Sequence, residues 1–157
     1  MPVVRPSLAA IWPSFTLFPL AGIALLALGA GRDGVMLAIG AALLAFNAAS
    51  VANYAHFTTL RVEGDELVYR TLFGARVERV PVGSLQRIDA KRYPGAHSGV
   101  SAPHFVARGR AATVKVNTKP FRLADFGPLI AVVRGANARV ELDPFWSRVA
   151  AGEDVSK

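Results

Sequence analysis

Five basic side chains in the second half of the chain could bind an anionic group. They are Lys91, Arg92, Arg108, Arg110 and Lys115. Lys91 and Arg92 end one predicted strand, and the other three fall on a predicted β-hairpin. A basic surface beside an anionic leaflet gains about 1 kcal/mol per residue, which makes these residues candidates for contact with lipid headgroups. The alternative is a solvated face of mixed sign, because Glu78, Asp89 and Asp125 lie nearby in the sequence.

The residue types that commonly carry catalysis do not form a recognisable group. The histidines are His56, His97 and His104; His97 lies near Ser98 and Ser101, but a His–Ser pair needs a third, orienting group to become a triad. The sequence has no nucleophile elbow, phosphate-binding glycine loop or metal-binding histidine pair. It has no cysteine, which excludes disulfides and thiolate metal sites. We therefore expect no catalytic residue, no metal and no cofactor, with a hydrolase using His97 or His104 as the less favoured alternative.

The net charge of +7 also raises the question of nucleic-acid binding. Such a site would need aromatic side chains interleaved with the basic ones on one face of a sheet. Tyr93, Phe105 and Phe121 are predicted to be core residues, and no nucleic-acid-binding motif is present. The sequence therefore argues against a nucleic-acid partner.

A long apolar region precedes these residues and predicts where they act. Residues 8–30 and 35–57 contain no charged side chain, and only the segment 31–34 separates them. Each stretch, at about 1.5 Å per residue, would form a helix long enough to cross a hydrocarbon core roughly 30 Å thick. We therefore predict a hairpin of two transmembrane helices within residues 1–57, followed by one small domain.

Basic residues near the ends of this hairpin predict its orientation. Arg5 precedes it, and Arg61, Arg70 and Arg76 follow it, whereas the loop carries only Arg32. The side richer in Lys and Arg is usually cytoplasmic, so both termini and the domain are expected inside the cell. Aromatic residues at the same end are predicted to lie at the membrane interface: Trp12, Tyr54, His56 and Phe57.

Small and polar residues of the second stretch are predicted to pack helices together: Ala41, Ala45, Asn47, Ala48, Ser50 and Ala52. Their recurrence at spacings of three and four lets two backbones approach closely in lipid. Packing against the first stretch is the simpler interpretation, and a dimer or a partner subunit is the alternative. Neither stretch contains Asp, Glu, Lys or Arg, so an ion carrier is lacking and transport is disfavoured.

From Thr58 the apolar pattern changes to the two-residue alternation of β-strands. Turns are predicted at 63–66 and 73–74, and the segments 105–108 and 112–117 are predicted to pair as a hairpin. In all, about six short strands are expected, with one buried face.

The strands are followed by a predicted helix and a short tail. Asp125 and Pro128 indicate a helix start, and Gly135 is a stop signal. A further short strand is predicted over 138–142. The tail 143–157 is predicted to hold one helical turn around Phe145 and Trp146 and then to fray.

The region after the apolar stretches resembles the bacterial PH-like (pleckstrin-homology-like) domains, many of which follow one or two transmembrane helices. The segments that carry the resemblance are 58–62, 65–70, 73–76 and 80–88. Over residues 58–142 it implies an α+β fold, a strongly bent antiparallel sheet or barrel capped by one C-terminal helix. In eukaryotic relatives, basic residues around the first loop bind phosphoinositide headgroups. Here that loop is 63–66, with three acids and no base, so that site is not expected.

The sequence thus predicts a non-enzymatic, membrane-anchored protein of the bacterial inner membrane. The resemblance implies that its PH-like domain binds a protein partner, or a second copy, or helps to organise a membrane complex at the cytoplasmic face. An exposed strand edge or the loop 94–103 is the expected docking surface. The alternative is a module that senses anionic membrane lipids through the five basic residues.

Overall fold

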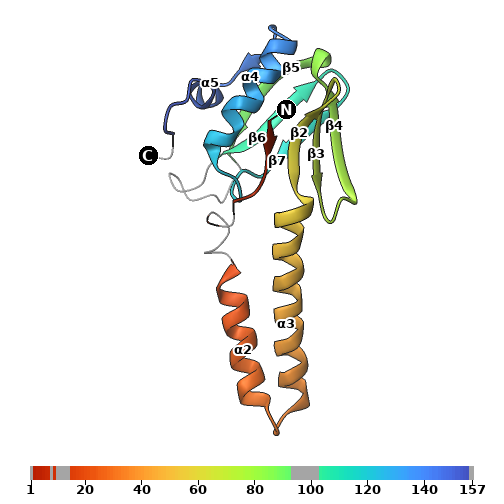
Figure 1. The fold of residues 1–157 in the computed structure, drawn as a ribbon, viewed down its shortest axis with the longest axis vertical. Helices are drawn as coiled ribbons and strands as arrows, with labels where there is room; N and C mark the ends of the chain where they lie inside the picture. The colour runs from red at the N-terminus through yellow and green to blue at the C-terminus, as the bar shows by residue number, and fades with distance from the viewer. Residues whose placement is uncertain (1, 8, 10–14, 93–102, 156–157) are drawn as a thin grey trace.

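The structure is a computed structural model, and it describes residues 2–7, 9, 15–92 and 103–155. Within these residues the chain forms an α+β fold with two four-stranded sheets and four α-helices. In Figure 1 two long helices lie below the sheets, and the other two helices pack beside the sheets. Trp12, His97 and the loop residues 94–102 lie outside the described parts.

The two long helices are α2, Leu17–Gly29, and α3, Gly34–Ala52, which continues as a wider helical turn, η1, Asn53–Phe57. Asp33 caps α3, because its Oδ1 accepts hydrogen bonds from the backbone N–H groups of Val35 (2.8 Å) and Met36 (3.3 Å). The combined helix Gly34–Phe57 has 24 residues and contains an 18-residue stretch with a mean hydropathy of 2.0, so by length and composition it could cross a membrane. The described helix α2 is shorter than the stretch 8–30 from which it was predicted.

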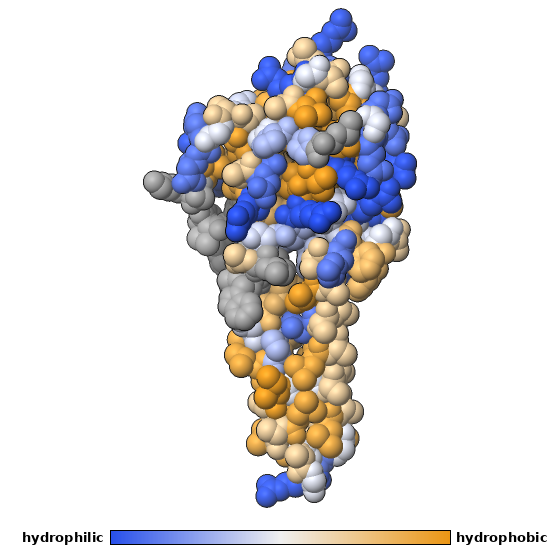
Figure 2. All heavy atoms as spheres, in the orientation of Figure 1, coloured by the Kyte–Doolittle hydropathy of each residue, from blue (hydrophilic) through white to orange (hydrophobic). Residues whose placement is uncertain are grey.

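Helices α2 and α3 lie side by side and approach most closely at glycines (Figure 1). A Cβ atom on Gly40 would lie 2.8 Å from the carbonyl oxygen of Gly22. Nearer the domain, the rings of Phe15 and Tyr54 meet in a T-shaped arrangement with centroids 5.8 Å apart. Figure 2 shows apolar side chains along both helices and hydrophilic ones over much of the domain.

The first sheet has the strand order β1-β2-β3-β4 and is antiparallel throughout. Its strands are β1, Val3–Val4; β2, Thr59–Glu63; β3, Glu66–Thr71; and β4, Arg76–Pro81. The turns between the last three strands fall where the sequence predicted them. The sequence analysis did not predict β1, which precedes the apolar region and yet pairs with β2. Val4 has no exposed surface, so residues on both sides of the apolar region build one core.

The second sheet has the order β7-β6-β5-β8. Its strands are β5, Leu85–Lys91; β6, His104–Gly109; β7, Thr113–Val116; and β8, Glu141–Leu142. The predicted pairing of β6 with β7 is confirmed, while β8 runs parallel to β5. At the junction of the sheets, Glu78 Oε2 accepts a hydrogen bond from the backbone N–H of Lys115 at 2.8 Å. A side chain of β4 thereby satisfies a donor of β7.

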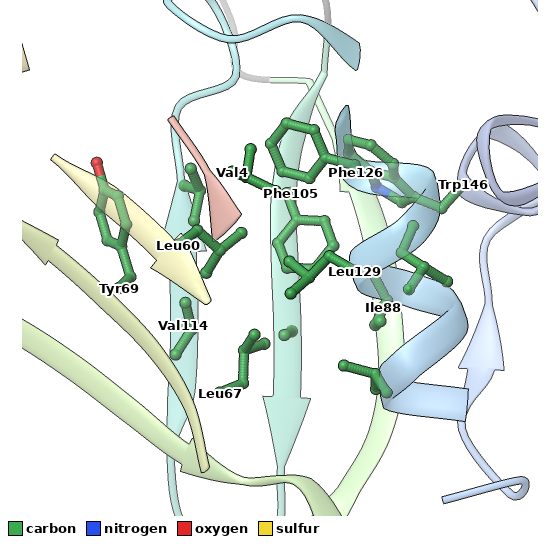
Figure 3. Packing of buried hydrophobic residues seen from close by; sticks show 14 of the residues in the cluster. Val4, Leu60, Leu67, Tyr69, Ile88, Phe105, Val114, Phe126, Leu129 and Trp146 are labelled. Carbon is green, nitrogen blue, oxygen red and sulfur yellow. The ribbon is translucent and has the colours of Figure 1, made fainter. Parts of the chain in front are cut away.

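The core lies between the sheets and two helices, α4, Phe126–Ala136, and α5, Pro144–Ala150. Helix α4 confirms the predicted helix after Asp125. The resemblance implied one capping helix, but α5 also packs on the domain. Trp146 of α5 is fully buried against Phe105 and Phe126, with ring centroids 5.1 Å apart in both pairs (Figure 3). The tail therefore contributes to the core instead of fraying after one turn, because this large aromatic ring gains most by leaving water.

Candidate functional site

An open groove of about 530 Å³ lies where β5 begins, β6 ends and the chain leaves α4. Four arginines line it, against one glutamate, Glu141. The arginines are Arg87, Arg108, Arg110 and Arg139. We refer to this feature as the arginine groove. Its net positive charge and its five-donor guanidinium groups suit carboxylate or phosphate oxygens.

Two of these arginines are held by a shared carboxylate. Arg87 and Arg108 face each other across β5 and β6, an arrangement in which like charges repel. Asp89 lies between them: its Oδ1 is 2.5 Å from Arg87 Nε, and its Oδ2 is 2.6 Å from Arg108 Nε. The bridge fixes both side chains while leaving half of each exposed, 52% in both cases. Their outer N–H groups therefore stay available for a ligand.

The other two arginines are free to bind. Arg110 lies in the β6–β7 turn and Arg139 follows α4; both are exposed, and neither forms an ion pair with a carboxylate of the described residues. Asn137 positions this part of the groove. Its Nδ2 donates to the carbonyls of Val82 (2.9 Å) and Leu85 (3.0 Å), and its Oδ1 accepts from the backbone N–H of Arg139 (3.2 Å).

The start of β5 and the end of β6, which line the arginine groove, lie at the end of the domain opposite the long helices (Figure 1). Strand β5 runs from the groove at Leu85 to Lys91, and β6 returns from His104 to the groove at Gly109. At about 3.3 Å per residue, the groove is some 15–20 Å beyond Lys91 along the strands. That distance exceeds the Debye length, about 8 Å at physiological salt. A bilayer crossed by α3 would therefore attract this groove only weakly.

The five basic residues chosen from the sequence do not form one surface. Arg108 and Arg110 lie in the groove, whereas Lys91 and Arg92 lie at the opposite end of β5, and Lys115 lies on β7 beside Glu78. Sequence reasoning missed Arg87 and Arg139. The alternation of β5, with Arg87 two residues before Asp89, could have indicated the first of them.

A second charged group lies on the outer face of the first sheet. Glu63 accepts hydrogen bonds from Arg61 Nε at 2.7 Å and from Arg70 Nη2 at 3.0 Å. The bonds from Arg70 and then from Arg61 lower the pKa of Glu63 to about 2. Arg61 and Arg70 are less exposed, 39% and 33%, than the arginines that share Asp89, and neither lines the groove, so we assign this cluster a structural role.

The junction of α3 with the sheet presents apolar side chains at the helix end of the domain. Leu72 and Phe73, in the β3–β4 turn, are 55% and 53% exposed, and Phe57 at the end of η1 is 43% exposed. The Phe57 and Phe73 rings lie 5.3 Å apart. Asn53 is buried, and its Oδ1 accepts a hydrogen bond from the backbone N–H of Phe73 at 2.7 Å.

The backbone of this turn is unusual. Leu72 and Phe73 both have positive φ, 52° and 55°, which costs about 1–2 kcal/mol per residue for side chains other than glycine. Hairpin turns of this kind normally use Asn and Gly. The hydrogen bond from Phe73 to Asn53 and the ring contact with Phe57 hold the strained conformation in place.

Other predicted residues are placed as follows. Tyr54, His56 and Phe57 lie together in η1, at the domain end of α3. Of the helix-packing set, Asn47, Ser50 and Ala52 are half-buried, whereas Ala41, Ala45 and Ala48 are exposed. His104 lies on β6, and burial lowers its pKa. Among the described residues no three His, Asp or Glu side chains are grouped as a metal site.

Comparison with known proteins adds no relative to these observations. No family model matches the chain, and no curated protein or solved structure matches it either.

Proposed function

We propose that this protein is a non-enzymatic, two-pass protein of the bacterial inner membrane, with a PH-like domain on the cytoplasmic face. The arginine groove of that domain binds an acidic segment of a protein partner. The observation that carries the proposal is the groove itself, four arginines gathered at the end of the domain that faces away from the long helices.

The pairing of β1 with β2 supports two crossings. Val3–Val4 and Thr59–Glu63 are neighbours in one sheet, so the chain leaves the domain and returns to it on the same side of a membrane. If α3 crosses once, residues between β1 and α3 cross as well. The described helix α2, 13 residues, spans about 20 Å, which is less than the roughly 30 Å of a hydrocarbon core. The excess of arginine near the domain favours the cytoplasmic side.

The strand order supports the PH-like assignment. An antiparallel sheet of β1 to β4 packs against a second one built from β5, β6 and β7, and α4 packs over the core between them. The resemblance implies a bent antiparallel sheet or barrel with one capping helix. The additions are β8 and α5, and the departure is that β1 precedes the membrane region instead of following it.

Charge and position together favour a protein ligand. Arg110 and Arg139 form no ion pair with a carboxylate of the described residues, and salt would screen most of the attraction between the groove and the headgroups of an adjoining bilayer. The groove is open to solvent, as an extended peptide requires, and its four arginines suit carboxylates. Lipid sensing through Lys91 and Arg92, which lie nearer the helices, is the alternative.

A binding experiment on the full chain tests this function. The chain is placed in phosphatidylcholine nanodiscs and titrated with a fluorescent peptide rich in Asp and Glu, and anisotropy is read. The double variant Arg110→Gln with Arg139→Gln is compared with Lys119→Gln with Arg134→Gln, two exposed basic residues outside the groove. Both variants lose the same charge. At about 0.2–1 kcal/mol per exposed pair, the groove variant should bind ~2- to 30-fold more weakly.

Two results would contradict the proposal. Equal weakening by both variants would mean that the peptide senses only net charge. Unchanged peptide binding by the groove variant, together with loss of binding to phosphatidylglycerol vesicles when Lys91 and Arg92 are changed to Gln, would favour the lipid-sensing alternative.

A further inference from the structure

The β3–β4 turn has features that neither core packing nor the arginine groove explains. Its first two residues, Leu72 and Phe73, are large and apolar, and each is more than half exposed. In water these positions favour small or polar residues, and both backbones here have the positive φ that side chains other than glycine avoid. Something other than turn formation must account for the residue types.

The position of the turn indicates what surrounds it. Strand β3 runs toward the long helices, so the turn lies at the level where α3 ends and the domain begins (Figure 1). The ring of Phe73 contacts that of Phe57, the last residue of the apolar helix. The two rings thus place exposed apolar side chains at the domain end of α3.

The turn is also held rigidly to the helix. Asn53 accepts the N–H of Phe73, and Thr58 donates through Oγ1 to the carbonyl of Asn53 at 3.1 Å. The Oγ1 atoms of Thr58 and Thr71 are 3.3 Å apart. These contacts fix where the two apolar side chains project relative to the axis of α3.

We propose that the β3–β4 turn is an interfacial membrane anchor, with Leu72 and Phe73 inserted among the lipid headgroups of the bilayer that α3 crosses. The occupant of this surface is lipid, because Phe73 contacts Phe57, the last residue of the candidate membrane-spanning helix, so the turn lies at the end of that helix. The anchor adds a second contact with the bilayer and so sets the tilt of the domain, which keeps the arginine groove directed away from the membrane. This inference rests on the proposed membrane location.

Site-directed spin labelling tests the proposal, and the absence of cysteine in the chain allows single labels on the full protein. Nitroxides are attached to Leu72→Cys, to Ala45→Cys on the exposed face of α3, and to Asp65→Cys in the β2–β3 turn at the opposite end of the domain. The protein is reconstituted in phosphatidylcholine–phosphatidylglycerol vesicles. Collisions with oxygen, which concentrates in lipid, are compared with collisions with a water-soluble nickel chelate.

The expected order of oxygen-to-nickel accessibility is Ala45 highest, Leu72 intermediate and Asp65 lowest. A Leu72 label as accessible to nickel as the Asp65 label, with Ala45 in lipid, overturns the anchor and leaves the membrane location standing. A Leu72 label shielded from both reagents indicates a protein contact and also overturns it. An Ala45 label in water overturns the membrane location and the anchor together.

A second variant separates the anchor from a merely structural turn. Leu72→Asn with Phe73→Gly supplies residues that suit the backbone of the turn, so the fold is retained. In this variant a nitroxide at Ala75→Cys, beside the turn, should become more accessible to the nickel chelate than in the otherwise unchanged chain. Equal accessibility in the two backgrounds would refute a role for these side chains in membrane contact.

Discussion

Replacing Trp146 should destabilise the domain more than any change in an ordinary C-terminal tail could. Its indole ring is fully buried and lies 5.0–5.1 Å, between centroids, from the rings of Phe105, Phe126 and Phe145. Its Nε1–H donates to the carbonyl oxygen of Asp89 at 3.0 Å. Strand β8 pairs with Arg87 and Ile88 of β5 and does not extend to Asp89. Trp146 therefore supplies a hydrogen-bond donor to the Asp89 carbonyl, which β8 does not reach.

The expected cost separates into a packing part and a hydrogen-bond part. Trp146→Ala removes the whole ring and leaves a cavity, which typically costs about 3–5 kcal/mol. Trp146→Phe keeps an aromatic ring but leaves the Asp89 carbonyl without its donor, at about 1–3 kcal/mol. Ser147→Ala, at an exposed position of the same helix, should change the free energy of unfolding by less than about 0.5 kcal/mol.

Hydrogen exchange measured by mass spectrometry on the full chain in nanodiscs provides the assay. For amides of β5 and β6 that exchange through unfolding of the domain, Trp146→Ala should speed exchange by about 100- to 5,000-fold, and Trp146→Phe by ~5- to 150-fold. If Trp146→Ala behaves like Ser147→Ala, α5 does not belong to the core and the packing described for the tail is wrong.

Three further predictions concern other parts of the chain. The pKa of Glu63 is lowered in the folded protein to about 2 from an ordinary value of 4.5. Its contribution to stability is therefore present above pH 4.5 and is lost as pH falls toward 2. Over this range the urea midpoint should fall more in the unchanged protein than in Glu63→Gln, and parallel curves of midpoint against pH would contradict this. Gly40→Ala should weaken the packing of α2 against α3, because its Cβ would lie 2.8 Å from the carbonyl oxygen of Gly22, whereas a Cβ on Gly34 would meet nothing within 4 Å. Resistance to unfolding in sodium dodecyl sulfate should drop for Gly40→Ala and not for Gly34→Ala. An equal response of the two variants would argue against the glycine contact. Val4→Ala should cost about 1.5–3 kcal/mol in hydrogen-exchange stability of β2, and Val3→Ala, 39% exposed, much less; equal small effects would exclude β1 from the core.

The candidate site could be predicted only in part from the sequence. Arg108 and Arg110 were identified because they lie on a recognisable hairpin. Arg87 and Arg139 were missed because they are far from that hairpin in the sequence and reach it only through the pairing of β5 with β6 and the packing of α4. The same tertiary arrangement places Lys91 at the end of β5 opposite the groove. The five basic residues selected from the sequence are therefore separated in space.

The membrane end shows the same contrast. The sequence predicted Tyr54, His56 and Phe57 as interfacial residues from their place at the end of an apolar stretch. It gave no reason to associate Leu72 and Phe73 with them, because a predicted turn has no direction until the sheet is built. The structure supplies that direction by bringing Phe73 to Asn53 and Phe57.

The sequence by itself determined the features that depend on neighbouring residues. These are the apolar helix α3, the paired strands β6 and β7, and helix α4, each set by a local period and by turn or end signals. The tertiary structure alone decided that β1 forms, which strand β8 pairs with, and that α5 is buried in the core. Strands of two residues carry no period, and their partners lie more than fifty residues away, so only the closing of the core around Val4 and Trp146 makes these segments favourable. The arginine groove is a product of that closure, since its residues come from segments that meet nowhere in the sequence.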